Sequence, residues 1–213
     1  MLPGRGRGRA APAAKVPRRR LDLEERREEL LAAAFELFVT RGYDEVGMED
    51  VARVAGASKG LVYHYFPTKK DLYRAAVARG AGLLLERVDT GGDDAPLARL
   101  EAGLDAYFAY VAEHRSAYEA LMRSGVGVDP EVAVILEQTR EEIARRLLEG
   151  LPLVGPDAVV RAAVRGWIGF VEALALGWLA SPDPDRTVLR QLALGVLQQS
   201  VTLAVALGSS REG

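Results

Sequence analysis

Apolar positions recur along most of the chain with the spacing of an α-helix. In one stretch Met48, Val51, Ala52 and Ala55 fall at i, i+3, i+4 and i+7, which predicts a short helix with a single apolar face. Gly56 follows this helix, and glycine readily takes the left-handed conformation that is common just past a helix C-terminus. The pattern therefore predicts a short helix that stops sharply.

A second short helix is predicted directly after this stop. Ser58 is expected to cap it by accepting a hydrogen bond from the backbone N–H of Gly60 or Leu61. Leu61 and Val62 can pack inward, which leaves a polar and aromatic outer surface made by Lys59, Tyr63, His64 and Tyr65. Two helices joined by a tight turn with glycine are typical of the DNA-binding helix-turn-helix, whose second helix enters the major groove.

Longer helices are predicted on either side of this pair. The earlier one has an apolar stripe made by Leu23, Leu30, Leu31, Ala34, Phe35 and Phe38. Asp22 with Glu25 three residues later resembles a capping box at its start, and Thr68 with Asp71 predicts a capped helix that runs to about Leu84. We expect the stripe to bury against the two short helices.

The second half of the chain keeps the helical spacing, with proline and glycine between the segments. Pro96 is expected to open a helix that runs through Glu113, and Ser116 with Glu119 is expected to cap a short helix after it. Further helix starts are expected at Asp129-Pro130, Gly155-Pro156 and Asp183-Pro184. No segment alternates as a strand does, so the prediction is an all-α chain of about nine helices.

The short helices and their surroundings resemble the DNA-binding domain of the tetracycline-repressor (TetR) family of bacterial transcriptional regulators. The matching segment runs from about Glu24 to about Leu84. Its separated elements are Thr40-Arg41-Gly42-Tyr43, Val51-Ala52, Ala55-Gly56-Ala57-Ser58, Leu61-Val62-Tyr63-His64-Tyr65-Phe66 and Lys69-Lys70-Asp71-Leu72. Members usually carry Ser or Thr before the first motif helix, whereas Gly47 stands here and lacks a hydroxyl for a phosphate. The resemblance implies a DNA-binding domain over 22–84, with its motif at about 47–66, and a regulatory and dimerisation domain over 85–213.

The family pattern also implies which side chains meet DNA. Tyr63, Tyr65 and Lys69 are expected to hold phosphates, while Lys59 and His64 are expected to approach base edges. The backbone N–H groups at the start of the first motif helix offer a further phosphate contact. The DNA-binding residues predicted from the motif are Met48, Ser58, Lys59, Gly60, Leu61, Tyr63, His64, Tyr65 and Lys69.

Small residues line one face of the helix before the last. They are Ala162, Gly166, Gly169, Ala173 and Gly177. A glycine inside a helix costs roughly 1 kcal/mol relative to alanine, so we expect the close approach of another helix to compensate. The final helix carries a matching face with Leu192, Val196, Ser200 and Leu203. Packing within one chain and packing between two chains both fit this pattern, and the TetR resemblance favours a homodimer through the last two helices.

Aromatic and polar side chains in the second half are candidates for a ligand cavity. They are Tyr107, Phe108, His114, Tyr118, Met122, Trp167 and Phe170. Ordinary core packing is the alternative for each of them, but Tyr, Trp and His bring polar atoms into an apolar setting, which suits an amphipathic ligand. Glu172 lies among apolar positions about two turns after Arg165, which predicts an ion pair or a solvated edge.

Charge is distributed unevenly along the chain. Residues 1–20 hold seven basic residues and no acidic residue, while the other 193 hold 21 basic and 30 acidic residues. We interpret residues 1–21 as a disordered basic arm. A solubilising tail is one interpretation, and the other is a DNA-binding arm in which Arg19 and Arg20 lie nearest the helix-turn-helix.

Composition excludes several other classes of protein. The chain has no cysteine, which excludes disulfides and thiolate metal sites, and no cofactor or metal is predicted. No uninterrupted apolar run of about 18 residues is present, so no membrane partner is expected. With two histidines and no Glu-x-x-His, Gly-x-Ser-x-Gly or P-loop pattern, an enzyme is not expected.

The function predicted from these features is a dimeric transcriptional repressor in the bacterial cytoplasm. It would bind a palindromic operator and be released from it by a small, largely apolar effector. The alternatives are a constitutive DNA binder or activator without an effector, and a helical interaction protein that no longer binds DNA. The alternative that no longer binds DNA is disfavoured because the motif keeps Lys59, Tyr63, Tyr65 and Lys69 intact.

Overall fold

The computed structural model describes residues 23–89, 95–122, 129–150, 158–181 and 183–209, and the regular elements in these ranges are nine α-helices. They are α1 (Leu23–Glu45), α2 (Met48–Val54), α3 (Lys59–Tyr65), α4 (Lys69–Val88), α5 (Pro96–Glu113), α6 (Arg115–Ala120), α8 (Pro130–Gly150), α9 (Ala158–Ala180) and α10 (Arg186–Ser209). The all-α class is confirmed.

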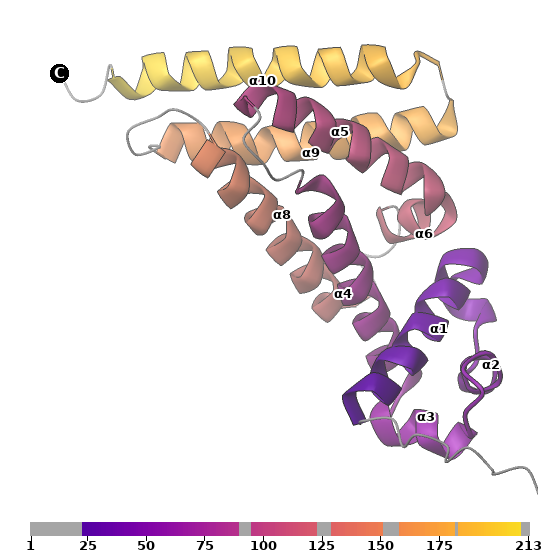
Figure 1. Ribbon diagram of the computed structural model, residues 1–213. Coiled ribbons are helices and arrows are strands. Elements are labelled where there is room, and N and C mark those ends of the chain that lie inside the picture. The colour runs from indigo at the N-terminus through magenta and orange to yellow at the C-terminus, as the bar shows by residue number, and fades with distance from the viewer. Residues whose placement is uncertain (1–22, 90–94, 123–128, 151–157, 182, 210–213) are drawn as a thin grey trace, which may run out of the picture.

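The helices form two units joined by a pair of long helices (Figure 1). One unit holds α1, α2, α3 and the start of α4, and the other holds α5, α6, α9 and α10. Helices α4 and α8 contact each other and run side by side between the units. Helix α6 also packs against α1, so the first unit touches the second directly as well as through α4 and α8.

Each unit has its own buried core. In the first, Leu30 on α1, Val51 on α2 and Val62 on α3 are fully buried, as the apolar spacing predicts. In the second, Phe108 on α5 and Val164 on α9 are fully buried. The fourth predicted helix extends four residues past Leu84, to Val88, and its two ends pack against the two different cores.

Two predicted helix starts are wrong. Ser116 lies inside α6, which begins at Arg115 directly after His114, so it does not cap that helix. The last helix begins at Arg186 and not at Pro184, because the Asp185 carboxylate accepts the backbone N–H of Thr187 at 2.8 Å. The predicted starts at Asp22 and at Gly155-Pro156 lie outside the described residues.

Helix α10 differs from the sequence expectation in another respect. By length and composition alone, Arg186–Gly208 is apolar enough to cross a membrane. Glutamine, serine and threonine interrupt the apolar run along this helix, but its mean hydropathy stays high. One face of α10 packs on α9 through Leu189, Ala193 and Leu197, and most of the rest is exposed.

Candidate nucleic-acid interface and effector cavity

The turn between α2 and α3 has the geometry that the sequence predicts. Gly56 takes a positive φ of 60°, and the next residue, Ala57, donates its N–H to the Ala52 carbonyl at 2.8 Å. The Ser58 hydroxyl then accepts the Leu61 N–H at 3.2 Å and caps α3. These bonds fix the direction in which α3 leaves the turn.

The outer face of α3 carries the side chains expected to meet DNA. Lys59, Tyr63 and His64 are exposed, as is Gly60. Tyr65 is half-buried and packs on the core of the first unit, with its ring 5.2 Å from that of His64. The face thus combines a cation, an imidazole and two phenols.

Lys69 belongs to the same surface although it starts α4. Its Nζ lies 4.4 Å from the centroid of the Tyr43 ring and 3.4 Å from the Asp44 carbonyl oxygen. These contacts hold the ammonium at the start of α4, which follows α3 by three residues. Thr68 and Asp71 form a capping box that fixes where α4 begins.

Two carboxylates lie on α2 beside this surface. Glu49 forms an ion pair with Lys59, which raises the pKa of the lysine. Asp50 accepts the N–H of Gly47 at 3.0 Å and forms an ion pair with Arg53, and both bonds lower its pKa. The exposure of the Glu49–Lys59 pair limits the strength of that pair.

Gly47 caps α2 with the help of Asp50, so the missing hydroxyl does not prevent capping. The Met48 side chain is buried in the core, so only its backbone N–H at the helix N-terminus is available for a phosphate. Arg19 and Arg20 lie outside the described residues.

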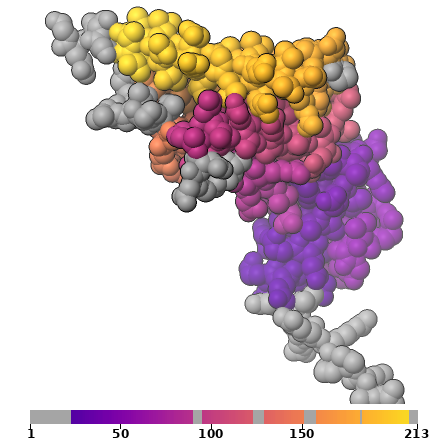
Figure 2. Space-filling model, turned by 45° about the horizontal axis from the view of Figure 1, so that its top comes forward, coloured from indigo at the N-terminus to yellow at the C-terminus, as the bar shows by residue number. Residues whose placement is uncertain are grey.

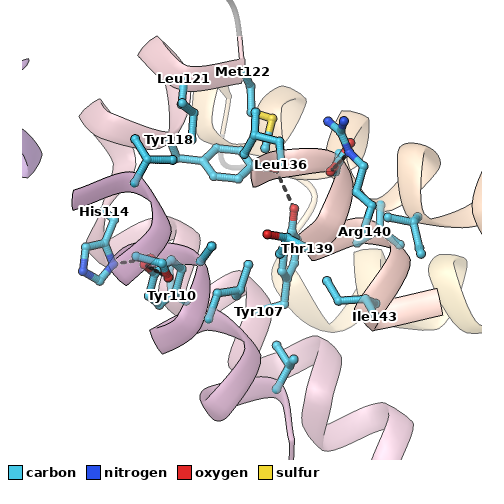
Figure 3. A pocket seen from close by; sticks show the side chains of 18 of the residues that line it. Tyr107, Tyr110, His114, Tyr118, Leu121, Met122, Leu136, Thr139, Arg140 and Ile143 are labelled. Atoms are coloured by element: carbon cyan, nitrogen blue, oxygen red, sulfur yellow. Dashed lines mark hydrogen bonds and ion pairs between the residues drawn. The ribbon is translucent and has the colours of Figure 1, made fainter. Parts of the chain in front are cut away.

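A cavity of about 1080 Å³ lies between the two cores. Helices from both units line it, including α1 and α4 on one side and α5, α6, α8, α9 and α10 on the other. Its walls include five of the seven residues predicted for a ligand: Tyr107, His114, Tyr118, Met122 and Trp167. Figure 3 shows four of these five around the open space.

The other two predicted lining residues do not line this cavity. Phe108 is fully buried in the core and packs edge-to-face on Trp178, with centroids 6.0 Å apart. Phe170 borders a small groove beside Trp178 and Pro184. Successive helical residues point about 100° apart, so Tyr107 faces the cavity while its neighbour faces the core.

Sequence reasoning missed the contribution of α8 to the cavity. Leu136, Thr139, Arg140 and Ile143 lie on the wall formed by this helix (Figure 3). Their i, i+3, i+4, i+7 spacing was a usable signal, because it predicts that the four share one face.

Polar groups gather at one part of the wall. The hydroxyl oxygens of Tyr107 and Tyr118 lie 2.6 Å apart in a hydrogen bond, and burial raises the pKa of both groups. Arg140 donates from Nε to Glu172 at 2.8 Å. Glu172 is therefore ion-paired as expected, but with α8, while Arg165 bonds Glu137.

A second polar group connects the cavity wall to the first unit. The Tyr110 hydroxyl donates to the Gly80 carbonyl at 2.8 Å, and burial raises the pKa of Tyr110 to about 12. The His114 ring stacks on Tyr110, with centroids 4.2 Å apart, and lies 5.6 Å from the Phe35 ring of α1. Helices α1, α4 and α5 therefore meet at one aromatic cluster.

An ion pair also connects α4 to the start of α8. Arg74 donates to Asp129 from Nε at 3.0 Å and from Nη2 at 3.3 Å. Arg74 thereby lowers the pKa of the Asp129 carboxyl, and it also contacts Glu131 at 2.8 Å.

Most of the small-residue stripe on α9 is left uncovered by the described part of the chain. Ala162, Gly166, Ala173 and Gly177 are exposed, and a Cβ added to Gly166, Gly169 or Gly177 would meet no atom within 4 Å. On α10, Leu192 and Leu203 are exposed and Val196 and Ser200 are half-buried. Figure 2 shows α10 along the outer edge of the molecule.

Comparison with known proteins identifies the family. A family model described as bacterial regulatory proteins, tetR family, matches residues 30–76, and one described as tetracyclin repressor-like, C-terminal domain, matches residues 96–198. A solved tetR-family transcriptional regulator from Streptomyces coelicolor has a TM-score of 0.79 and 34% identity, with 88% of this chain and 85% of that one covered. This chain belongs to the TetR family.

Two curated relatives extend the comparison. The transcriptional activator FasR of Mycolicibacterium smegmatis is 34% identical over 140 residues, which cover 63% of each protein and thus less than two thirds of FasR. The transcriptional repressor KstR of Rhodococcus jostii is 28% identical over 181 residues, which cover 81% of this chain and 82% of KstR. The chain is a DNA-binding transcriptional regulator, and the expectation that it is not an enzyme is confirmed by its family.

Proposed function

We propose that this TetR-family regulator is a homodimer that binds a pseudo-palindromic operator and is released from it by a small, largely apolar effector. The observation that carries the proposal is the cavity, which is walled by helices of both units. A molecule that fills it would touch the DNA-reading unit and the second unit at once. Such a protein would act on DNA in the bacterial cytoplasm.

DNA binding is assigned to α3 and the start of α4. Tyr63, Tyr65 and Lys69 would hold phosphates, and Lys59 and His64 would approach base edges. The exposure of Lys59, Tyr63 and His64 supports these roles. Ser58, Gly60 and Leu61 would lie at the N-terminal end of the same helix, close to the DNA backbone.

The DNA roles are tested by selecting bound duplexes from a random pool. A palindrome with half-sites about 34 Å apart, or a multiple of that distance, is expected from a two-fold dimer. His64→Ala should cost about 1–3 kcal/mol at particular base pairs and relax specificity there, whereas Lys69→Ala should weaken all sequences similarly and lower the salt slope. An unchanged consensus for His64→Ala would remove this residue from base reading. If the apparent DNA affinity did not fall as salt was added, the result would favour the alternative of a helical interaction protein that no longer binds DNA.

Dimerisation is assigned to the exposed faces of α9 and α10. The interface would include Ala162, Gly166, Gly169, Ala173 and Gly177 from α9. It would also include Leu192, Val196, Ser200 and Leu203 from α10. Exposed apolar side chains on α10 and uncovered glycines on α9 both support this assignment, because contiguous apolar patches of this kind mark interaction sites.

Effector control would act through α4, which runs from the DNA-reading unit to the second unit. An effector shifts the equilibrium only if it prefers the arrangement that does not fit DNA, and couplings of about 1–3 kcal/mol are typical. The test is operator affinity measured with and without a panel of apolar compounds. If none of them bound the protein or changed operator affinity, the protein would be a constitutive DNA binder.

An activator is the second candidate, because FasR is named an activator and KstR a repressor. A reporter gene placed behind the selected operator separates the two. Loss of reporter expression on deleting the regulator would establish activation, and a gain would establish repression.

We also propose that residues 1–21 form a DNA-binding arm in front of domains over 22–84 and 85–213. Seven basic residues without an acidic residue would add affinity that depends on salt and not on sequence. Removal of residues 1–21 should weaken all duplexes alike and reduce the salt slope. An unchanged slope would leave this segment as a solubilising tail.

A further inference from the structure

The polar part of the cavity wall determines what chemical group an effector can place there. This inference rests on the proposed effector control and adds the chemistry of the effector. The groups come from three helices: Tyr107 on α5, Tyr118 on α6, and Thr139 and Arg140 on α8 (Figure 3). All four line the cavity.

The two tyrosines present a single unused proton. Their hydroxyl groups share one hydrogen bond of 2.6 Å, so one hydroxyl proton is used in that bond and the other is available. Both side chains are buried, at 8% and 7% exposure, and burial raises the pKa of each phenol. The pair therefore stays uncharged near neutral pH and can donate one hydrogen bond into the cavity.

Thr139 adds an acceptor beside this donor. Its hydroxyl donates to the Ile135 carbonyl of its own helix at 2.8 Å, so its proton is used while its oxygen retains free lone pairs. A ligand oxygen that both accepts and donates a hydrogen bond would find partners here.

The charges at the wall are already balanced. Arg140 donates from Nε to Glu172 at 2.8 Å, and from Nη1 to Glu137 at 3.5 Å. Glu137 is in turn held by both of its oxygens on Arg165, at 2.7 and 2.6 Å, and this bond lowers its pKa. Two cations and two anions form one cluster with no net charge.

A charged ligand head would disturb that balance. A carboxylate would bring a third anion against two cations at a place where the Arg140 and Glu172 side chains are only 18% and 20% exposed. At this part of the wall the ion would lose hydration without gaining an unpaired cation, which is unfavourable in a poorly hydrated site. An uncharged oxygen accepts a hydrogen bond without changing the charge of the cluster.

The rest of the cavity suits an apolar body. Its wall beyond the polar groups is mostly apolar and includes Leu84, Leu100, Leu104, Ile143, Leu147 and Leu197, although charged side chains such as Lys70, Arg99 and Arg146 also line the cavity away from the tyrosine pair. We propose that the effector has an apolar body and an uncharged head with a hydrogen-bond-accepting oxygen, such as an ester, a ketone or an alcohol, and that the part of the wall formed by Tyr107, Tyr118, Thr139 and Arg140 rejects the matching carboxylate.

The experiment compares four compounds that share an alkyl chain and differ in their head group: methyl dodecanoate, 1-dodecanol, dodecanoate and dodecylamine. Binding to the full-length protein at neutral pH is followed by the fluorescence of Trp167, which lines the cavity, with Trp178 replaced by phenylalanine. The ester and the alcohol are expected to bind at least tenfold more tightly than either charged compound. Operator affinity is measured with each compound at saturation.

Two variants assign the discrimination to the named groups. Glu172→Gln removes one anion from the cluster and should improve dodecanoate binding about tenfold, with the ester changed by no more than about twofold. Tyr107→Phe with Tyr118→Phe removes the donor while leaving no unpaired buried hydroxyl, so ester binding should fall about twofold to tenfold. Tyr73→Phe, at a tyrosine elsewhere on the wall, is the control and should change neither dodecanoate binding nor ester binding. Far-ultraviolet circular dichroism checks the fold of each variant.

The outcomes separate this inference from the proposed function. If dodecanoate bound as tightly as its methyl ester, or Glu172→Gln did not improve its binding, the inference about the head would be wrong while effector control stood. If none of the four compounds bound and operator affinity stayed constant, effector control by an apolar molecule would fail, and the inference with it.

Discussion

Glu49 places a carboxylate next to Lys59, the lysine of α3 that is proposed to approach base edges. The two side chains are 73% and 53% exposed and form an ion pair that must break if Lys59 is to reach a base edge. The carboxylate also repels phosphates. If Lys59 has this role, Glu49 would compete with DNA for the same ammonium group.

Glu49→Gln should raise affinity for all duplexes by about twofold to fivefold, as expected for the loss of an exposed ion pair. The gain should be larger at low salt because exposed charges are screened. Fluorescence anisotropy at several salt concentrations measures it. Glu86→Gln removes the same charge from an exposed position on the second half of α4 and should have no effect. Equal changes in both variants would show a general charge effect only.

Single residues were predicted well where local chemistry decides their role. Gly56 and Ser58 act through bonds within a few residues, so the sequence alone was sufficient. The prediction that Phe108 lines the cavity is wrong, because the aromatic character of a residue does not show which way its side chain points. Arg140 was missed because its partner, Glu172, lies 32 residues away on another helix.

Helix α4 carries two glycines whose roles differ. A Cβ on Gly80 would lie 2.9 Å from Cε2 of Phe35 and 3.3 Å from the Tyr110 hydroxyl, whereas a Cβ on Gly82 would meet nothing within 4 Å. Phe35 is buried in the first core, so its ring has little room to move. Gly80 thus permits the close crossing of α4 with α1 and α5.

Gly80→Ala should lower the free energy of unfolding by about 1–2 kcal/mol, because overpacking outweighs the gain from alanine in a helix. Gly82→Ala should raise it by up to about 1 kcal/mol. Urea unfolding followed by circular dichroism measures both. If Gly80→Ala stabilised the protein as much as Gly82→Ala, the close contact would not constrain this crossing.

The ion pair between Arg74 and Asp129 connects α4 to α8 and makes stability depend on pH. Because the folded protein lowers the pKa of Asp129, the contribution is complete above the unfolded value of about 3.9 and is lost as pH falls through the folded pKa. Asp129→Asn should therefore melt below the wild type at pH 6.5, and the difference should shrink as pH falls below about 4. Glu131→Gln, an exposed partner of the same arginine, should have a smaller effect. A difference that stayed constant down to pH 3.5 would contradict this origin.

Helix positions were easier to predict than helix contacts. The periodic spacing predicted α5 with its start and end, and proline marked its first turn. The start of α10 was misplaced because two aspartates flank Pro184 and either can cap a helix. The helices that meet at Gly80 could not be predicted, because a glycine in a helix is compatible both with a bend and with the close packing of another helix.

At the scale of the whole molecule, the apolar faces of α9 and α10 are expected to join two chains. Gly169→Leu adds a large side chain where the single chain leaves open space, so the fold should survive while the dimer clashes. Light scattering at micromolar concentration should then report a monomer. Gly150→Leu, at an open glycine at the end of α8, should remain dimeric. A monomeric wild-type protein would contradict the dimer itself.

The two-unit architecture was within reach of the sequence, whereas the cavity between the units was not. Charge, apolar spacing and the helix-turn-helix separated a DNA-reading unit from a helical remainder. A cavity, in contrast, depends on how side chains from distant segments pack. The residues that line this one range from Phe35 to Val201 along the sequence. No local pattern contains that information.

The separation of the two cores has a consequence for how the protein melts. Leu72 and Ala76 of α4 belong to one core, while Leu84 and Val88 pack on the other, with the cavity between them. The cavity separates the cores except where α1, α4 and α5 meet at Gly80 and where α6 packs on α1, so each core should lose its structure at its own temperature. Differential scanning calorimetry of the unliganded protein should show two overlapping transitions. An occupant of the cavity would merge them into one, because heat would then have to disrupt both cores together.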